Sequence, residues 1–322
     1  MRFLKSEAGA IVLWLASALF LAALFTPHLY EAGKTLAENA KTTDYPGWIE
    51  SIASSADRAK LDRYFSRCLL VSALALLPFL ILRVRRIPKL DDHARYALRK
   101  LTWSQRCIHL FCGLTIGAAS LGALALILHY TGASEANDKV FSLSKLIPKA
   151  VIPSLGAGII EELLFRGLLL GIWLRAYSVR SAWIGSSLMF SFVHFLKPPA
   201  ETIIANPSVW YSGFEVLDGT LGHFTNPLFF ITNFFTLTTL GLILAYTRTR
   251  THSLWFPIGL HAGLVFSFKI FSRNCSINME SPMYPWLIGN DLKSGILPLA
   301  ALCICSIVCA YTVRKLSKPN LV

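Results

Sequence analysis

Two adjacent carboxylates and an arginine lie within an apolar stretch of the 322-residue chain, at Glu161, Glu162 and Arg166. A charged side chain at the centre of a bilayer costs roughly 2.5–3.5 kcal/mol on insertion scales, so such groups pair or line a water-filled hollow. Glu162 and Arg166 are four residues apart and share one helix face, where they can pair. Glu161 is turned about 100° away, toward another helix. Apolar residues continue to Leu174, which argues against an early helix end with interfacial charges.

Two histidines lie in later apolar stretches, His194 four residues after Phe190 and His261 further along the chain. A single histidine on an apolar helix face is usually a hydrogen-bonded core residue. Two of them with a glutamate, however, supply imidazoles and a carboxylate, the groups that hold water and move protons in acid–base catalysis. Asn233 lies in another apolar stretch, where a hydrogen bond to a neighbouring helix is the favoured interpretation.

The elements predicted to position these side chains are membrane-spanning helices. Hydrophobic residues make up 54% of the chain and charged residues 15%, with a mean hydropathy of +0.53. Stretches of about 18 or more apolar residues are long enough to span a bilayer. The sequence therefore predicts an all-α transmembrane bundle in one domain, 1–322, whose core, 148–268, carries the charged groups. The eight predicted spans are 8–26, 65–84, 107–129, 148–174, 182–197, 226–247, 252–271 and 294–313.

The net charge of +13 is concentrated in particular loops. Loop 83–106 holds eight Lys and Arg residues against two Asp, and the positive-inside rule therefore places it in the cytoplasm. Counting spans from this loop places both termini, and the turns at Arg175 and Arg248, on the same side. No basic face with interleaved aromatics is present, so nucleic acid is not an expected partner. Short loops and an uncleaved N-terminal anchor predict a multi-pass protein of a bacterial cytoplasmic membrane.

Three motifs in order resemble those of a known family. Glu-Glu-x-x-x-Arg at 161–166, Phe-x-x-x-His at 190–194 and the later His261 are similar to the motifs of the CPBP family. This is the group of type II CAAX prenyl proteases and bacteriocin-processing enzymes, also called the Abi family. The resemblance covers residues 148–268 and makes Phe190 a packing residue of its motif. It implies an intramembrane endopeptidase that acts on a membrane protein or a lipid-modified peptide in the lipid bilayer.

The resemblance also implies a role for each matching residue. Glu161 would deprotonate the attacking water, and His194 would orient that water and shuttle its proton. His261 would stabilise the oxyanion, a contribution of several kcal/mol for a well-placed donor. Glu162 and Arg166 would hold Glu161 in place.

A zinc-dependent mechanism is the alternative for the same residues. Glu161, His194 and His261 can bind zinc with one coordination position left open. The chain lacks the i, i+4 histidine pair of an HExxH helix, however. A metal-independent glutamic mechanism without a cofactor is therefore preferred.

The chain departs from the family pattern at one position. The family usually has Asn four residues after the last motif histidine, whereas this chain has Val265, which cannot donate a hydrogen bond. Asn233 is a candidate for supplying that donor. Two other functions stay open: a catalytically silent member acting as an immunity or interaction protein, and a proton-coupled transporter, because intramembrane Glu, His and Arg also mark proton relays. No inverted repeat or pair of broken helices is visible in the sequence, which weighs against transport.

Overall fold

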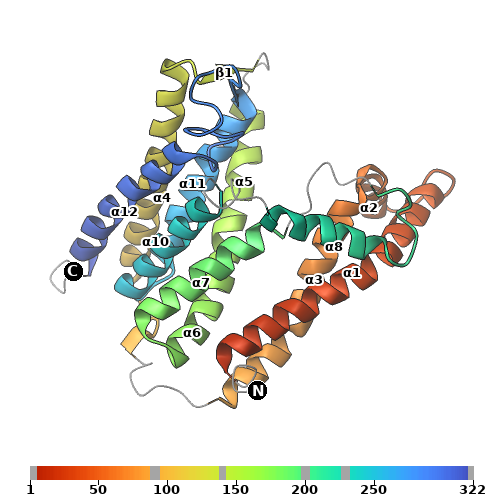
Figure 1. Ribbon diagram of the computed structural model, residues 1–322, viewed down its shortest axis with the longest axis horizontal. Helices are drawn as coiled ribbons and strands as arrows, with labels where there is room; N and C mark the ends of the chain where they lie inside the picture. Colours follow the sequence, from red (N-terminus) through yellow and green to blue (C-terminus); the bar gives the residue numbers. More distant parts are fainter. Residues whose placement is uncertain (1–5, 88–94, 138–142, 197–203, 226–232, 318–322) are drawn as a thin grey trace. The chain divides into compact units, whose positions relative to one another are not determined.

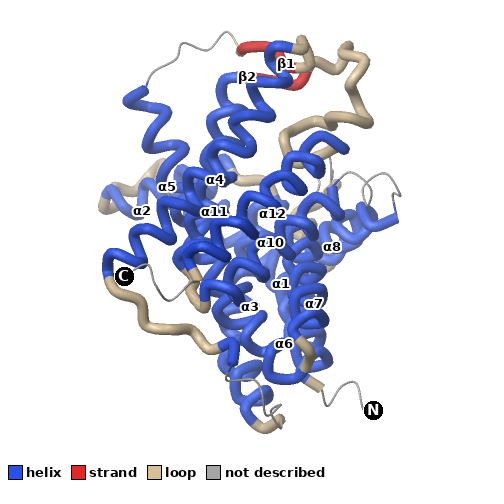
Figure 2. The backbone as a smooth tube through the Cα atoms, turned by 90° about the vertical axis from the view of Figure 1, so that its left-hand side faces the viewer, coloured by secondary structure: helices blue, strands red, loops and turns tan. Residues whose placement is uncertain are grey.

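The computed structural model of the protein describes residues 6–87, 95–137, 143–196, 204–225 and 233–317. Apart from one small sheet, these residues form helices joined by turns, as Figures 1 and 2 show. The strands of the sheet are β1 (Ser134–Ala136) and β2 (Cys275–Ile277). The helices are α1 (Glu7–Asn39), α2 (Gly47–Arg58), α3 (Leu61–Arg85), α4 (Trp103–Tyr130), α5 (Leu143–Glu162), the π-helical η3 (Leu163–Leu169), α6 (Leu170–Ala176), α7 (Val179–His194), α8 (Ser212–Gly222), the 3-10 helix η4 (His223–Thr225), α10 (Phe235–Thr251), α11 (Trp255–Asn274) and α12 (Ile296–Leu316).

The chain divides into two compact units. Unit 1 comprises residues 1–88 and 193–226, and unit 2 comprises residues 89–192 and 227–322. Each unit has its own helix contacts and is described by itself. The single transmembrane domain over 1–322, with its core at 148–268, stays a prediction.

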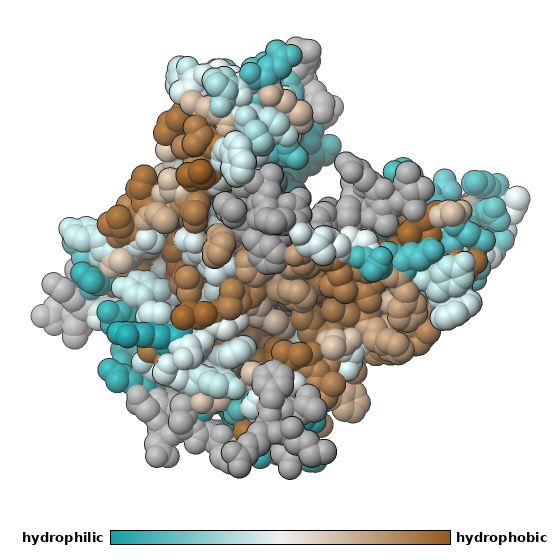
Figure 3. Space-filling view, in the orientation of Figure 1, coloured by the Kyte–Doolittle hydropathy of each residue, from teal (hydrophilic) through white to brown (hydrophobic). Residues whose placement is uncertain are grey.

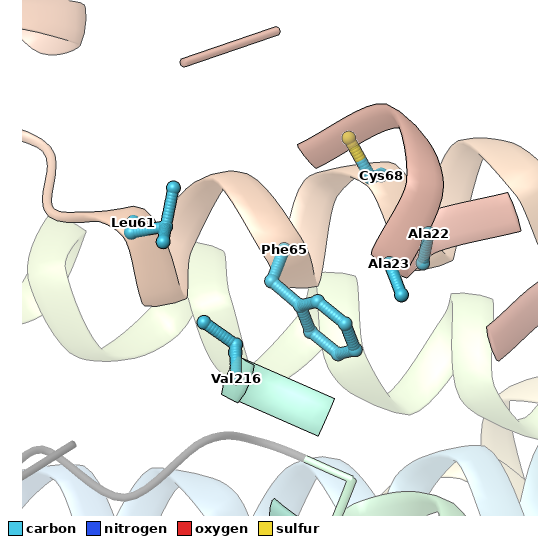
Figure 4. Close-up of a cluster of buried hydrophobic side chains, with 6 residues drawn as sticks. All are labelled: Ala22, Ala23, Leu61, Phe65, Cys68 and Val216. Carbon is cyan, nitrogen blue, oxygen red and sulfur yellow. The ribbon is translucent and has the colours of Figure 1, made fainter. Parts of the chain in front are cut away.

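In unit 1, α1 packs along α3, and α8 packs against both helices. Phe65 is fully buried at the centre of a hydrophobic cluster that includes Ala22, Ala23 and Val216 (Figure 4). Because alanine carries only a methyl group, α8 comes so close to α1 that a Cβ at Gly213 would overlap the backbone of Ala23. Small side chains therefore set the distance between the helices of this unit.

In unit 2, α4 and α11 approach each other at backbone distance. Gly113 and Gly117 of α4 lie against α11, and Gly259 and Gly263 of α11 lie against α4. A Cβ at any of the four would overlap a carbonyl oxygen of the opposite helix. Both pairs have the small-xxx-small spacing by which membrane helices associate closely. α5 also packs against α11, α12 packs against α4 and α10, and the antiparallel β1–β2 pair connects the end of α4 with the end of α11.

Five described helices are long and apolar enough to cross a membrane by length and composition: α1, α3, α4, α11 and α12. They coincide with five of the eight predicted spans. The other three are helical but shorter or divided: α7 and α10 have 16 and 17 residues, and the span predicted at 148–174 consists of α5, η3 and α6. Residues 226–232 of the predicted sixth span lie outside the described residues. The all-helical fold is thus confirmed, while eight spans and cytoplasmic termini stay predictions.

Large hydrophobic side chains are exposed along these helices. Phe79 of α3 is 68% exposed, and Ile304 and Ile307 of α12 are 65% and 70% exposed. Figure 3 shows such hydrophobic surface, in brown, over long stretches of the molecule. Soluble monomers rarely expose large contiguous apolar patches. These faces are therefore suited to lipid, in agreement with an integral membrane protein.

Candidate active site

A buried ion pair joins the end of α5 to η3. Nη1 of Arg166 donates to Oε1 of Glu162 at 3.0 Å, and the two side chains are 3% and 0% exposed. The four-residue spacing thus forms the pair that the sequence predicts. Arg166 lies in a π-helical stretch that continues α5 without a break. Such stretches are rare and are frequent at functional sites.

His261 of α11 binds the same carboxylate. Its Nδ1 lies 2.9 Å from Oε1 of Glu162. An ionised carboxylate only accepts hydrogen bonds, so Nδ1 carries the proton and donates it. Nε2 of His261 then lies 3.8 Å from Oε2 of Glu161. The buried Glu162 therefore orients the imidazole, and the Glu161 side chain, which is 31% exposed, lies beside the other ring nitrogen.

Aromatic rings surround the arginine of this cluster. The guanidinium carbon of Arg166 lies 4.2 Å from the ring centroid of Phe190, which is fully buried on α7. The Phe190 ring also contacts Phe165, at 5.0 Å between centroids, and His261, at 6.0 Å. A cation over a desolvated ring gains about 2 kcal/mol. Phe190 therefore packs against both the cation and the imidazole.

Close helix contacts fix the position of His261. On α11 it lies between Gly259 and Gly263, whose backbones touch α4. On another face of α11, a Cβ at Gly158 of α5 would lie 2.9 Å from the carbonyl oxygen of Ile258. These glycines are not among the residues predicted from the sequence, although the GxxxG spacing of the pairs on α4 and α11 is a recognisable signal. They hold α11 against α4 and α5 and so bring His261 to the glutamates.

The third predicted catalytic residue lies in the other unit. His194 is the last residue of α7, and unit 1 resumes at residue 193. Where His194 lies relative to Glu161 and His261 therefore stays a prediction. Within α7, His194 follows Phe190 by one helical turn and shares its face.

The predicted oxyanion donor is not part of the cluster. Asn233 is half-buried just before α10, and within the described residues it forms no hydrogen bond with Glu162, Arg166 or His261. Val265 is half-buried one turn after His261, at the position where the family usually has asparagine. A donor role for Asn233 stays a prediction.

A metal would need a further ligand beside this cluster. Within the described residues, no group of three or more His, Cys, Asp or Glu side chains is arranged to hold a metal ion. Glu161 and His261 offer two ligand atoms in unit 2, whereas catalytic zinc sites use three protein ligands. The zinc alternative therefore depends on His194 as the third ligand.

The fold and this cluster define a class of protein: a helical membrane protein with a carboxylate–imidazole–guanidinium cluster buried among apolar helices. Residues 143–267 match the family described as "Type II CAAX prenyl endopeptidase Rce1-like". The match confirms the resemblance to the CPBP family over these residues, which include Glu161, His194 and His261. Members are generally proteases, which supports a CAAX-protease-type intramembrane function at the family level. No curated protein and no solved structure matches the chain significantly.

Proposed function

We propose that the protein is an intramembrane endopeptidase of the CAAX-protease type that activates water with a glutamate and uses no metal. The observation that carries this proposal is the contact between Glu162 and His261, 2.9 Å from Oε1 to Nδ1. This contact turns Nε2 of His261 toward Glu161. A general base beside an oriented hydrogen-bond donor is what peptide hydrolysis requires.

In the proposed reaction, Glu161 takes a proton from water as the water oxygen bonds to the carbonyl carbon of the scissile peptide. The resulting oxyanion accepts a hydrogen bond from Nε2–H of His261, which is protonated at both nitrogens in this step. When the C–N bond breaks, the proton held by Glu161 passes to the leaving amine. His194 orients the attacking water and relays the proton from Glu161 to the leaving amine.

The charges of the cluster support a protonated His261. Two carboxylates, Glu161 and Glu162, then face two cations, Arg166 and the imidazolium, and the four charges sum to zero. A balanced cluster is less costly among apolar helices than one with a net charge. Oε1 of Glu162 contacts both the guanidinium of Arg166 and Nδ1 of His261, so the carboxylate holds the two cations together.

The family match implies a membrane-associated peptide as substrate. We assign the protein to a bacterial cytoplasmic membrane with both termini inside, and its substrate to a membrane protein or a lipid-modified peptide. A catalytically silent member that acts as an immunity or interaction protein is the second candidate. The specific observation that favours it is Val265, which leaves the usual donor position without a polar group.

The test compares C-terminal peptides from membranes of cells that express wild-type protein, Glu161→Gln or His261→Ala. In parallel, the purified proteins are incubated with farnesylated and unmodified CAAX peptides. We expect new C-termini with wild-type protein. The rate of peptide cleavage should fall at least about 100-fold for either variant, which is the effect of removing an oriented donor or a general base.

The matched control is Glu280→Gln, which removes an exposed carboxylate of the same unit. It should retain wild-type cleavage at equal protein level. Cleavage that persists in Glu161→Gln would refute the protease assignment. Absence of any cleavage product with wild-type protein, combined with an unchanged cellular phenotype in Glu161→Gln, would support the silent member instead.

A further inference from the structure

A second site lies at the opposite end of unit 2 from the β1–β2 sheet. A cavity of about 1000 Å³ opens among the start of α4, the start of α7 and the ends of α10 and α12. The segment 95–101 covers part of it, held by a hydrogen bond of 2.9 Å from the backbone N–H of Arg99 to the carbonyl of His252. The loop before α4, the turn after α10 and the end of α12, all of which the positive-inside rule predicts to be cytoplasmic, therefore meet around one cavity. The active-site cluster contributes no residue to it.

The cavity is strongly basic. Arg95, Arg99, Arg250 and Arg314 line it, and no Asp or Glu is among the described residues of its wall. Arg99, Arg250 and Arg314 are exposed side chains from three separate segments. Figure 3 shows the corresponding hydrophilic surface, in teal, near the end of α12. The like charges of Arg99, Arg250 and Arg314, held around one cavity, favour a bound anion.

Two imidazoles in the wall, one buried and one half-buried, each have a ring nitrogen without a hydrogen-bond partner in the described part of the chain. His109 is 5% exposed and lines the cavity, and its Nδ1 has no partner among the described residues. The same holds for Nδ1 of His252, at the turn after α10. Burial, and then the charges of Arg99 and Arg248, lower the pKa of His252, while a hydrogen bond with the backbone of Ala97 partly opposes this shift. An anion in the cavity would offset this positive field and accept a hydrogen bond from a ring nitrogen.

The helices beside the cavity present apolar faces that suit acyl chains. Ile108 and Phe111 of α4 are 46% and 60% exposed, and Val308 and Tyr311 of α12 are 44% and 61% exposed. Trp183 lines the cavity and donates from Nε1 to Oγ1 of Thr249 at 3.1 Å. Tryptophan with one apolar and one polar end is typical of the membrane–water interface. An anion in the cavity would therefore lie at the depth of a lipid headgroup.

We propose that this basic cavity binds the phosphate of an anionic phospholipid headgroup, while the acyl chains of that lipid lie along the exposed faces of α4 and α12. Basic pockets between transmembrane helices on the cytoplasmic side are suited to anionic headgroups. Free phosphate shares the charge, but it would make no use of the apolar faces that continue from the cavity.

The test measures lipid retention by native mass spectrometry on the full chain in detergent, with phosphatidylglycerol, phosphatidylcholine and inorganic phosphate as separate probes. Wild-type protein should bind phosphatidylglycerol at least about tenfold more tightly than the other two. The variant Arg99→Gln/Arg250→Gln/Arg314→Gln should bind phosphatidylglycerol about 100-fold more weakly than wild type. Each basic side chain near a membrane surface contributes about fivefold to the affinity for an anionic lipid.

The matched control removes three positive charges at the other end of the unit, Lys269→Gln/Arg273→Gln/Lys293→Gln. It should retain phosphatidylglycerol binding. A variant with lysine at the same three cavity positions keeps the charges, so its affinity for phosphatidylglycerol should stay within about tenfold of wild type. This result would show that the glutamine variant binds weakly because it lacks the charges and not because it is unfolded. Equal loss in the control, no preference over phosphatidylcholine, or equal affinity for inorganic phosphate would each overturn the proposal.

Discussion

Removing the charge of Glu162 should destabilise the fold more than removing that of Glu161, although the two residues are neighbours. Glu162→Gln keeps the volume of the side chain but leaves the 3%-exposed Arg166 guanidinium without its carboxylate. The groups that still contact Arg166 are a carbonyl of Gly241 at 3.4 Å and the rings of Phe165 and Phe190, none of which carries a full negative charge. Glu161 is the remaining carboxylate of the cluster and interacts with Arg166 less strongly than Glu162 does.

The magnitude follows from this burial. Breaking a buried pair by removing one partner costs about 3–5 kcal/mol, because a charge is left uncompensated. We expect about 3 kcal/mol for Glu162→Gln and a similar loss for Arg166→Gln. The double variant leaves no charge of the pair behind and should lose less than the sum, with a coupling free energy of about 2 kcal/mol. Glu161→Gln, at a 31%-exposed side chain, should cost less than about 1 kcal/mol.

The assay is equilibrium unfolding in mixed micelles, followed by circular dichroism as the fraction of denaturing detergent rises. Wild-type protein and the four variants are compared at the same total detergent concentration. A free energy of unfolding for Glu162→Gln within about 1 kcal/mol of wild type would refute the reasoning. So would additive losses in the double variant, since they would mean that Glu162 and Arg166 do not stabilise each other.

Three further predictions concern the metal, the helix contact and pH. Extensive dialysis against a chelator, followed by metal analysis, should leave cleavage activity unchanged; loss that zinc restores would contradict the glutamic mechanism. Gly117→Ala places a Cβ against a carbonyl of α11 and should lower the free energy of unfolding by about 1–3 kcal/mol and abolish most cleavage activity. The control Gly122→Ala, on the same helix with only Ser267 nearby at 3.9 Å, should change neither. Because the pKa of His252 is lowered, the unfolded chain binds a proton below about pH 6.5 that the folded chain does not. The free energy of unfolding of wild-type protein should therefore fall below that pH more steeply than that of His252→Asn. Asparagine is the replacement because it does not titrate and tolerates the left-handed backbone at this position (φ 52°). Parallel pH profiles of the two proteins would contradict this prediction.

The sequence alone predicts the membrane class and the chemical groups of the site. Long apolar stretches predict α3, α4, α11 and α12 within a few residues, because a lipid-spanning helix is recognised by its length and hydrophobicity. The start of α1 is predicted equally well, but the helix continues to Asn39, well beyond the predicted end at residue 26. Glu161, Glu162 and Arg166 stand out for the same reason, as charges in an apolar stretch. The order of these residues and the histidines His194 and His261 along the chain also predicts the resemblance to the CPBP family, which the match over residues 143–267 confirms.

Local periodicity does not reveal where a helix is interrupted. The span predicted at 148–174 changes from α-helical to π-helical turns after Glu162, which alters the register of every residue that follows. The apolar pattern around Leu163–Leu169 is compatible with either form. The change therefore depends on what surrounds the helix, here Phe190 and Gly241 against Arg166.

Only the tertiary structure decides which glutamate holds His261. The helical period predicts that Glu162 faces Arg166 and Glu161 faces elsewhere, yet His261 hydrogen-bonds Glu162 and only approaches Glu161. That contact joins residues 99 positions apart. It depends on how closely and at what rotation α11 lies against α4 and α5, and the glycine contacts between these helices set both. A sequence pattern records which face of a helix is polar, but the partner of that face is fixed by packing between segments that are distant in the chain.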